Sequence, residues 1–427
     1  MAECVADEWR SLREREILSI VTRLEHRRQA IMNRLHHFVW LSCEDRECRF
    51  PLTRLRMFPE LPYTGHTEYF STGNIELVFV ALLPIGQVLR FLDGTCGPPP
   101  AVLSTLRTRL EDISMLTAYP DLEQAGFKQS IADYAGVHPK QLVVANGFIP
   151  LLESALRTLR LKRCLLPVPA FVEYRRSLAR AGVEIEPHIL SPDSNFRYDI
   201  HVLVHGGHDA VLLANPQNPS GVLTTRDILL QFVSECAERN ITVLLDEAFI
   251  DYAPLNSLTL DVEQFANLIV FRSVTKFHGI PGLRVAHAVA NEAIARALNE
   301  TLPPWPITTL ASCAVASALS DQPFAERTRL HNDRRRARLR AGLDALGIHA
   351  YPSAANFLLL HLPEGISADR FWSHMIVEHH MVLRDCSNYE ALPSRHLRMA
   401  VRTAEENDKL VGAVAQLLPF CQRSQWA

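Results

Sequence analysis

One of the five lysines in this 427-residue chain lies in a setting suited to covalent chemistry. Lys276 follows Ser273 and Thr275 closely and precedes Arg284 by eight residues. The segment therefore places an amine, two hydroxyls and a guanidinium around what we predict to be one anionic ligand. Pyridoxal 5'-phosphate needs such a set, because a lysine amine condenses with its aldehyde while hydroxyls and an arginine bind its phosphate.

Three other segments with ligand-binding residue types each follow a short apolar run that predicts a strand. Gly147 permits a close approach of the backbone, and the free N–H groups of a helix that starts there can hold a phosphate. Asn218 lies in a loop with two Asn-Pro steps, an unusual sequence directly after a strand. Asp246 ends a buried strand, where an acid is costly without a cationic partner. A protonated pyridine nitrogen would be that partner.

Short apolar runs alternate with helical segments from about residue 75 to about residue 320. This alternation predicts an α/β fold with a mostly parallel sheet covered by helices on both faces. In such sheets, ligands bind beyond the carboxyl ends of the strands. We expect three parts: a helical extension over 1–72, a large cofactor-binding domain over 113–314, and a smaller α+β domain formed by 73–112 and 315–427.

Together and in this order, the four segments resemble the fold-type I pyridoxal phosphate enzymes, the class I and II aminotransferase family, over roughly residues 75–420. The resemblance implies an aspartate-aminotransferase-like fold. It also implies that Lys276 binds the cofactor and moves protons at the substrate Cα. Asp246 would pair with the ring nitrogen, and Asn218 would donate to the phenolic oxygen of the ring.

The resemblance also assigns the remaining cofactor contacts. The phosphate would be bound by the side chains of Ser273 and Arg284 and by the backbone N–H groups of Gly147 and Phe148. Phe171 would stack on the ring. Tyr119, in a Tyr-Pro-Asp sequence, would reach the phosphate of a neighbouring subunit, which predicts a homodimer with its active site at the subunit interface. Taken singly, Phe171 and Tyr119 are equally compatible with ordinary packing roles.

Two arginines near the end of the chain, Arg384 and Arg398, are predicted to grip the substrate, because guanidinium groups bind carboxylate and phosphate bidentately. A surface ion pair is the simpler alternative for each. Within the family, the chain most resembles threonine-phosphate decarboxylase and histidinol-phosphate aminotransferase. Arg398 would then hold the substrate carboxylate and Arg384 a distal phosphate or second carboxylate, and Asn74 would contribute to substrate binding. Phe249 stands where aminotransferases usually have a tyrosine.

Three functions follow as hypotheses. The first is the decarboxylation of a phosphorylated or otherwise acidic α-amino acid. The second is transamination of the histidinol-phosphate type. The third is a non-catalytic, pyridoxal-binding regulator in which residues 1–70 bind nucleic acid.

Composition bounds these hypotheses. With 48% hydrophobic and 21% charged residues and a net charge of −3, the chain is typical of a globular protein and indicates no nucleic-acid or membrane partner. It has no apolar run of about 18–20 residues and no signal peptide at its start. Nine unpatterned cysteines predict a reducing cytoplasm. Cys43 and Cys48 have a zinc-like spacing but lack a second pair, so we expect no metal.

Overall fold

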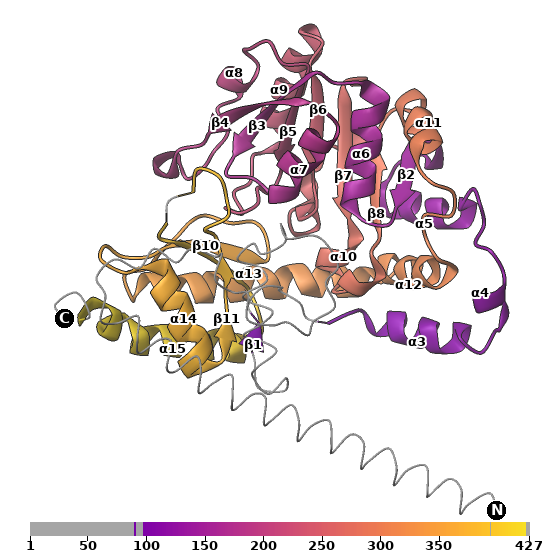
Figure 1. The fold of residues 1–427 in the computed structure, drawn as a ribbon. Helices are drawn as coiled ribbons and strands as arrows, with labels where there is room; N and C mark the ends of the chain where they lie inside the picture. The colour runs from indigo at the N-terminus through magenta and orange to yellow at the C-terminus, as the bar shows by residue number, and fades with distance from the viewer. Residues whose placement is uncertain (1–88, 91–96, 393, 424–427) are drawn as a thin grey trace, which may run out of the picture. The chain divides into compact units, whose positions relative to one another are not determined.

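The computed structural model describes residues 89–90, 97–392 and 394–423 (Figure 1). The predicted extension over 1–72, Asn74 and the Cys43–Cys48 pair lie outside these residues. None of the described helices is long and apolar enough to cross a lipid bilayer.

A seven-stranded sheet forms the large domain, in the order β2-β8-β7-β6-β5-β3-β4. Strand β8 runs antiparallel to both of its neighbours, and all other neighbouring pairs are parallel. The predicted, mostly parallel sheet is therefore confirmed. Its strands are β2 (Leu142–Ala145), β3 (Arg163–Val168), β4 (Glu184–Ile189), β5 (Ala210–Ala214), β6 (Thr242–Asp246), β7 (Leu268–Ser273) and β8 (Ala286–Val289).

Alternate residues of these strands enter two separate cores, as the two-residue period of a strand requires. Val143 packs in the core under α6, α7 and α11, whereas Leu142 and Val144 pack under α5, α9 and α12. Figure 1 shows α6 and α7 in front of the strands. The helices up to residue 319 are α3 (Pro100–Arg109), α4 (Ser114–Thr117), α5 (Ala125–Ala135), α6 (Phe148–Leu159), α7 (Val172–Arg180), α8 (Ile200–Leu203), α9 (Arg226–Glu238), α10 (Val274–Phe277), α11 (Glu292–Thr301) and α12 (Thr309–Leu319).

A four-stranded antiparallel sheet, in the order β12-β13-β10-β9, forms the smaller domain. Leu397 and Met399 pack under its helices, so Arg398 between them projects from the opposite face. Its elements are β9 (His349–Ala350), β10 (Phe357–His361), β12 (Arg384–Asp385), β13 (His396–Ala400), α13 (Gln322–Asp344), α14 (Ala368–His379) and α15 (Ala404–Arg423). A short parallel pair, β1 (Leu89–Arg90) with β11 (Met381–Val382), joins the start of the described chain to this domain. The predicted domain boundaries stay a prediction.

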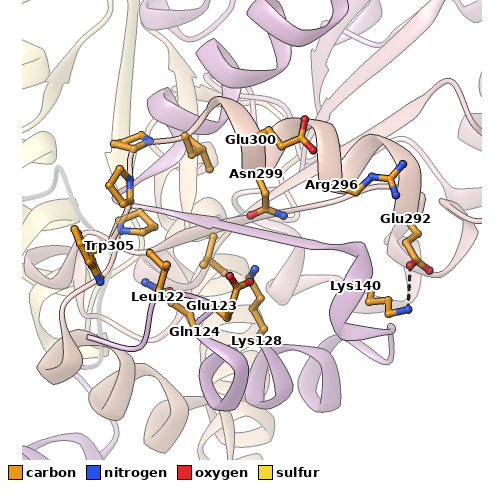
Figure 2. A pocket seen from close by; sticks show the side chains of 15 residues that line it. Leu122, Glu123, Gln124, Lys128, Lys140, Glu292, Arg296, Asn299, Glu300 and Trp305 are labelled. Atoms are coloured by element: carbon orange, nitrogen blue, oxygen red, sulfur yellow. Dashed lines mark ion pairs between the residues drawn. The ribbon is translucent and has the colours of Figure 1, made fainter. Parts of the chain in front are cut away.

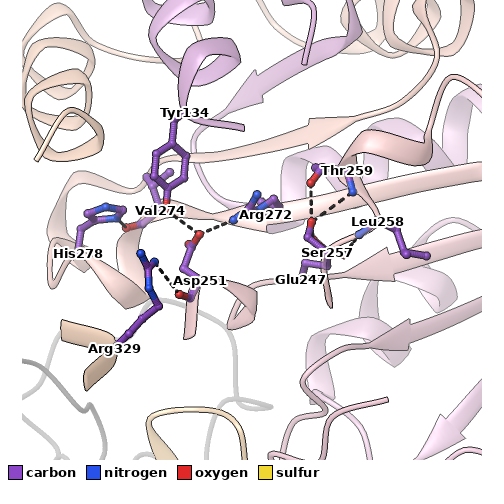
Figure 3. A network of polar contacts seen from close by, with 10 residues as sticks. All are labelled: Tyr134, Glu247, Asp251, Ser257, Leu258, Thr259, Arg272, Val274, His278 and Arg329. Atoms are coloured by element: carbon purple, nitrogen blue, oxygen red, sulfur yellow. Dashed lines mark hydrogen bonds and ion pairs between the residues drawn. The ribbon is translucent and has the colours of Figure 1, made fainter. Parts of the chain in front are cut away.

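A buried polar network adjoins the short helix α10, which contains Lys276 (Figure 3). The carboxylate of Asp251 accepts hydrogen bonds from Tyr134 Oη at 2.8 Å and from the Arg272 guanidinium. Asp251 and Arg272 are 3% and 6% exposed, respectively. Burial disfavours the charged form of Asp251, but the Arg272 guanidinium keeps the pKa of this carboxyl below its ordinary value. The pair thus fastens the segment after β6 to β7.

The same network reaches both residues that follow Lys276. Arg329 of α13 donates to the Asp251 carbonyl oxygen at 3.3 Å, and its guanidinium lies 5.7 Å from the centre of the Phe277 ring. The Nδ1 atom of His278 lies 3.0 Å from the Val274 carbonyl oxygen, within hydrogen-bond range. The position of α10 is therefore set partly by charges buried in the core.

We expect Arg272→Met to lower the free energy of unfolding by about 3–5 kcal/mol, because it leaves a buried carboxylate without its partner. Urea unfolding measures this loss. The matched control is Arg338→Met, which breaks a solvent-exposed ion pair with Asp408 (2.7 Å) and should cost no more than about 1 kcal/mol. Equal losses in the two variants would contradict the structural role of the Asp251–Arg272 pair.

Candidate active site

The predicted cofactor residues meet at one edge of the large sheet. Strands β5, β6 and β7 are parallel neighbours, so the Asn218 loop, Asp246 and Ser273 all emerge at the same end. Lys276 follows at once on α10, where its side chain is partly buried. Strand β2 points the same way and brings Gly147 to this edge.

Asp246 is buried, at 7% exposure, and two donors hold its carboxylate. The Tyr174 hydroxyl donates to Oδ2, and the Ala248 backbone N–H donates to Oδ1 at 2.9 Å. Burial raises the pKa of this carboxyl to about 6, although both hydrogen bonds and the charge of Lys276 act in the opposite direction. A carboxylate this buried favours a cation beside it, and a protonated ring nitrogen meets that requirement.

Tyr174 is a site residue that the sequence analysis did not assign. It is buried on α7, and its ring packs edge-on against Phe171, with the ring centres 5.5 Å apart. Phe148 lies 5.6 Å from Tyr174 by the same measure. Phe171, the ring predicted to stack on the cofactor, therefore packs directly against Tyr174, which donates the hydrogen bond to Asp246. The sequence held no local signal for this role, because 72 residues separate Tyr174 from Asp246.

The phosphate side is built around Gly147. Its φ of +96° favours glycine, and a Cβ atom there would lie only 3.0 Å from Arg284 Nη2. The guanidinium thus lies against the start of α6, where Phe148 is the first helical residue. On the other side of Lys276, the hydroxyls of Ser273 and Thr275 lie 2.8 Å apart. Backbone N–H groups, hydroxyls and a guanidinium are the donors that a phosphate requires.

The substrate side joins the two domains through Asn218. Its Oδ1 accepts hydrogen bonds from Arg398 Nη1 at 2.7 Å and from Tyr389 Oη at 3.1 Å. Arg384 and Arg398 are direct partners across β12 and β13, so both side chains project from the same face of the small sheet. The predicted arginines are therefore neighbours at the Asn218 loop.

Aromatic rings line this part of the site. The Arg398 guanidinium lies 4.8 Å from the centre of the Phe357 ring, and Phe357 packs edge-on against Phe249 at 5.0 Å. Arg384 lies 5.7 Å from the centre of the Tyr389 ring. Sequence analysis did not assign a role to Tyr389 or Phe357.

One predicted residue lies apart from the others. Tyr119 is 81% exposed, and its ring packs against Trp305 with the centres 4.8 Å apart. A pocket of about 540 Å³ opens beside Trp305, with Gln124, Lys128 and Arg296 in its lining (Figure 2). Its described lining includes none of the predicted cofactor contacts of the large sheet edge. The described residues also contain no group of three or more His, Cys, Asp or Glu side chains able to hold a metal ion.

We expect the cofactor-free protein to lose stability as the pH rises from about 4 to about 6. The folded pKa of Asp246, about 6, exceeds its ordinary value of 3.8. Protonation of Asp246 therefore stabilises the folded state at low pH. This contribution to the free energy of unfolding, about 3 kcal/mol, is lost as the pH rises from the ordinary pKa to the folded pKa. Asp246→Asn should remove this component, measured as the difference from wild type in urea unfolding across that range.

Burial also raises the pKa of Glu247, to about 7, so only the difference between variant and wild type isolates Asp246. Asp133→Asn, on the exposed face of α5, is the control and should follow the wild-type profile. Parallel profiles for wild type and Asp246→Asn would show that the buried carboxyl does not bind the proton.

Comparison with known proteins identifies the family. The family model for aminotransferase class I and II matches residues 83–414. Threonine-phosphate decarboxylase of Salmonella typhimurium is 30% identical over 354 residues, covering 81% of this chain and 96% of that protein. Histidinol-phosphate aminotransferase 2 of Methylococcus capsulatus is 33% identical over 337 residues, covering 76% and 88%, respectively.

A solved structure shows the same fold. Histidinol-phosphate aminotransferase from Sinorhizobium meliloti, determined in complex with pyridoxal-5'-phosphate, superposes with a TM-score of 0.71 at 21% identity, covering 86% of this chain and 99% of that one. The structural likeness confirms the predicted fold, and the family match confirms the predicted cofactor and enzymatic nature. The nucleic-acid binding that the regulator hypothesis assigns to residues 1–70 lies outside the described residues and stays a prediction. The chain belongs to the class I and II aminotransferase family of pyridoxal phosphate-dependent enzymes.

Proposed function

We propose that the chain decarboxylates an α-amino acid with a second anionic group, of which O-phosphothreonine is the model substrate. The observation that supports this most is the direct pairing of Arg384 with Arg398 beside Asn218. Two guanidinium groups on one face can bind two anionic groups of one small molecule. The relative named threonine-phosphate decarboxylase supports the same substrate class.

The cofactor contacts follow the arrangement at the sheet edge. Asp246 would face the ring nitrogen, Asn218 the phenolic oxygen, and Phe171 one face of the ring. The phosphate would lie among four groups, those of Gly147, Phe148, Ser273 and Arg284. When bound, the cofactor withdraws electrons from the Cα atom of an attached amino acid.

The reaction then depends on two residues of this chain. Arg398 would orient the substrate carboxylate, and this orientation decides which Cα bond is weakened. The amine of Lys276 would deliver a proton to Cα after carbon dioxide leaves, or would remove one from Cα in a transamination. Phe249 favours decarboxylation, because it lacks the hydroxyl that aminotransferases usually present there. Transamination remains the second candidate, supported by the relative named histidinol-phosphate aminotransferase.

We expect purified protein with pyridoxal phosphate to release carbon dioxide and an amine from O-phosphothreonine, without forming a keto acid. Arg384→Met should raise KM by about 100-fold, because it removes charge-assisted hydrogen bonds to the distal phosphate. Arg370→Met, at an exposed arginine of α14, is the control and should leave KM unchanged. Formation of a keto acid from O-phosphothreonine with 2-oxoglutarate as amino acceptor, or of 2-oxoglutarate from glutamate in a half-reaction, would establish the aminotransferase instead.

We also propose a homodimer in which Tyr119 serves the neighbouring subunit. Large apolar side chains lie exposed along α3, α4 and the segment that follows, at 50–81%: Leu103, Leu110, Ile113, Leu116, Tyr119 and Leu122. An exposed apolar surface of this kind marks an interaction site. Trp305, which packs on Tyr119, would belong to the same interface.

Co-expression of Lys276→Ala with Tyr119→Ala tests this arrangement. If Tyr119 acts across the interface, the mixed dimer contains one intact site, and activity should return to about a quarter of wild type from two nearly inactive parents. If Tyr119 acts within its own subunit, every site stays defective and activity does not return.

A further inference from the structure

Tyr389 contacts two parts of the site at once. It is buried, at 5% exposure, in the segment that follows β12. Its hydroxyl donates to Asn218 Oδ1 at 3.1 Å, and its ring faces the Arg384 guanidinium at 5.7 Å. One rigid side chain thus connects the arginine proposed for the distal anion with the amide proposed for the cofactor's ring oxygen.

The hydrogen bonds on Asn218 fix the orientation of its amide. Oδ1 accepts from both Tyr389 and Arg398, and an amide oxygen has two lone pairs for such bonds. With the oxygen so held, the Nδ2 donors are the part of the amide that can serve another acceptor. If either Tyr389 or Arg398 no longer donated to Oδ1, the Asn218 amide could rotate. The proposed hydrogen bond from Asn218 Nδ2 to the cofactor's ring oxygen therefore depends on both donors.

Three rings lie near the two arginines: Phe357 beside Arg398, Phe249 packed on Phe357, and Tyr389 beside Arg384. Phe249 packs against Phe357, and neither ring can donate a hydrogen bond. Tyr389 is the one tyrosine among these three rings, and its hydroxyl donates to Asn218. Position 249 thus offers no hydroxyl, while Tyr389 brings one from the small domain to Asn218.

An anion on Arg384 would alter the partners of that guanidinium. Arg384 Nη2 donates to Asn388 Oδ1 at 3.0 Å, and the cation also attracts the electron-rich face of the adjacent Tyr389 ring. An anion competes for the donors and weakens the attraction to the ring. A shift of the Tyr389 ring in response would move its hydroxyl relative to Asn218 Oδ1 and would so link the distal anion to the amide.

We propose that Tyr389 is a positioning residue that couples anion binding at Arg384 to the orientation of the Asn218 amide. In this role it makes turnover specific for substrates with a second anionic group. The inference rests on the proposed function in one respect, the assignment of Arg384 to a distal anion.

The first test uses absorbance of the holoenzyme and needs no substrate. The pH midpoint of the chromophore that the cofactor forms on Lys276 is measured with and without inorganic phosphate. In wild type, phosphate should shift the midpoint. In Tyr389→Phe, the midpoint without phosphate should rise by about 0.5 to 1 unit, because the ring oxygen loses part of its hydrogen bonding, and the response to phosphate should shrink.

Two further variants complete this test. Tyr351→Phe removes another buried hydroxyl from the same apolar cluster, one that lies 3.1 Å from His396 Nε2, and should behave as wild type. Arg384→Met should abolish the phosphate response whether or not Tyr389 is intact. A Tyr389→Phe enzyme that responds to phosphate as wild type does would overturn the proposal, as would a Tyr351→Phe enzyme with the same defect.

The second test uses turnover. Tyr389→Phe should lower kcat for O-phosphothreonine by about 10-fold with little change in KM, since the ring that faces Arg384 is kept. In the Arg384→Met background the same substitution should have almost no effect. If phosphothreonine is not decarboxylated but the phosphate response depends on Tyr389, the coupling holds and only the proposed substrate fails. If phosphothreonine is decarboxylated but neither the phosphate-induced shift of the midpoint nor kcat depends on Tyr389, the coupling alone is wrong.

Discussion

The burial of one carboxylate, that of Asp246, constrains the rest of the site. Removal from water favours the neutral form of this acid, while hydrogen bonds from Tyr174 and Ala248 favour the charged form. The balance leaves a group that is poised to ionise when a cation arrives. The predicted phosphate donors and the Asn218 loop meet at the same edge of the sheet, so together with Asp246 they would hold that cation in one orientation.

Residues close together in the chain could be placed from the sequence. Lys276, Ser273 and Arg284 share one connection, and Asp246 and Asn218 follow strands whose apolar runs are unmistakable. Parallel strands end at the same edge, so the pattern was enough to bring these residues together. The two arginines were singled out by the chemistry of their guanidinium groups, and the structure places them opposite each other on β12 and β13.

Contacts between distant parts of the chain could not be predicted in this way. Tyr174 meets Asp246 across 72 residues, and Tyr389 meets Asn218 across 171. Spacing along the chain says nothing about such pairs. The sequence of β4 gives a weak strand signal, because Glu184, Pro187 and His188 interrupt its apolar positions, and the antiparallel direction of β8 has no local signal at all.

The reversed strand β8 has a mechanical consequence. Strand β7 ends at the site and the antiparallel strand β8 begins there, so the connection between them does not have to cross the sheet. Residues 273 to 284 therefore stay together at one edge. The predicted attachment point of the cofactor therefore lies on the large sheet, whereas Arg384 and Arg398 lie on the small sheet. The two groups are carried by separate hydrophobic cores, so a change that loosens one core need not displace the residues held by the other.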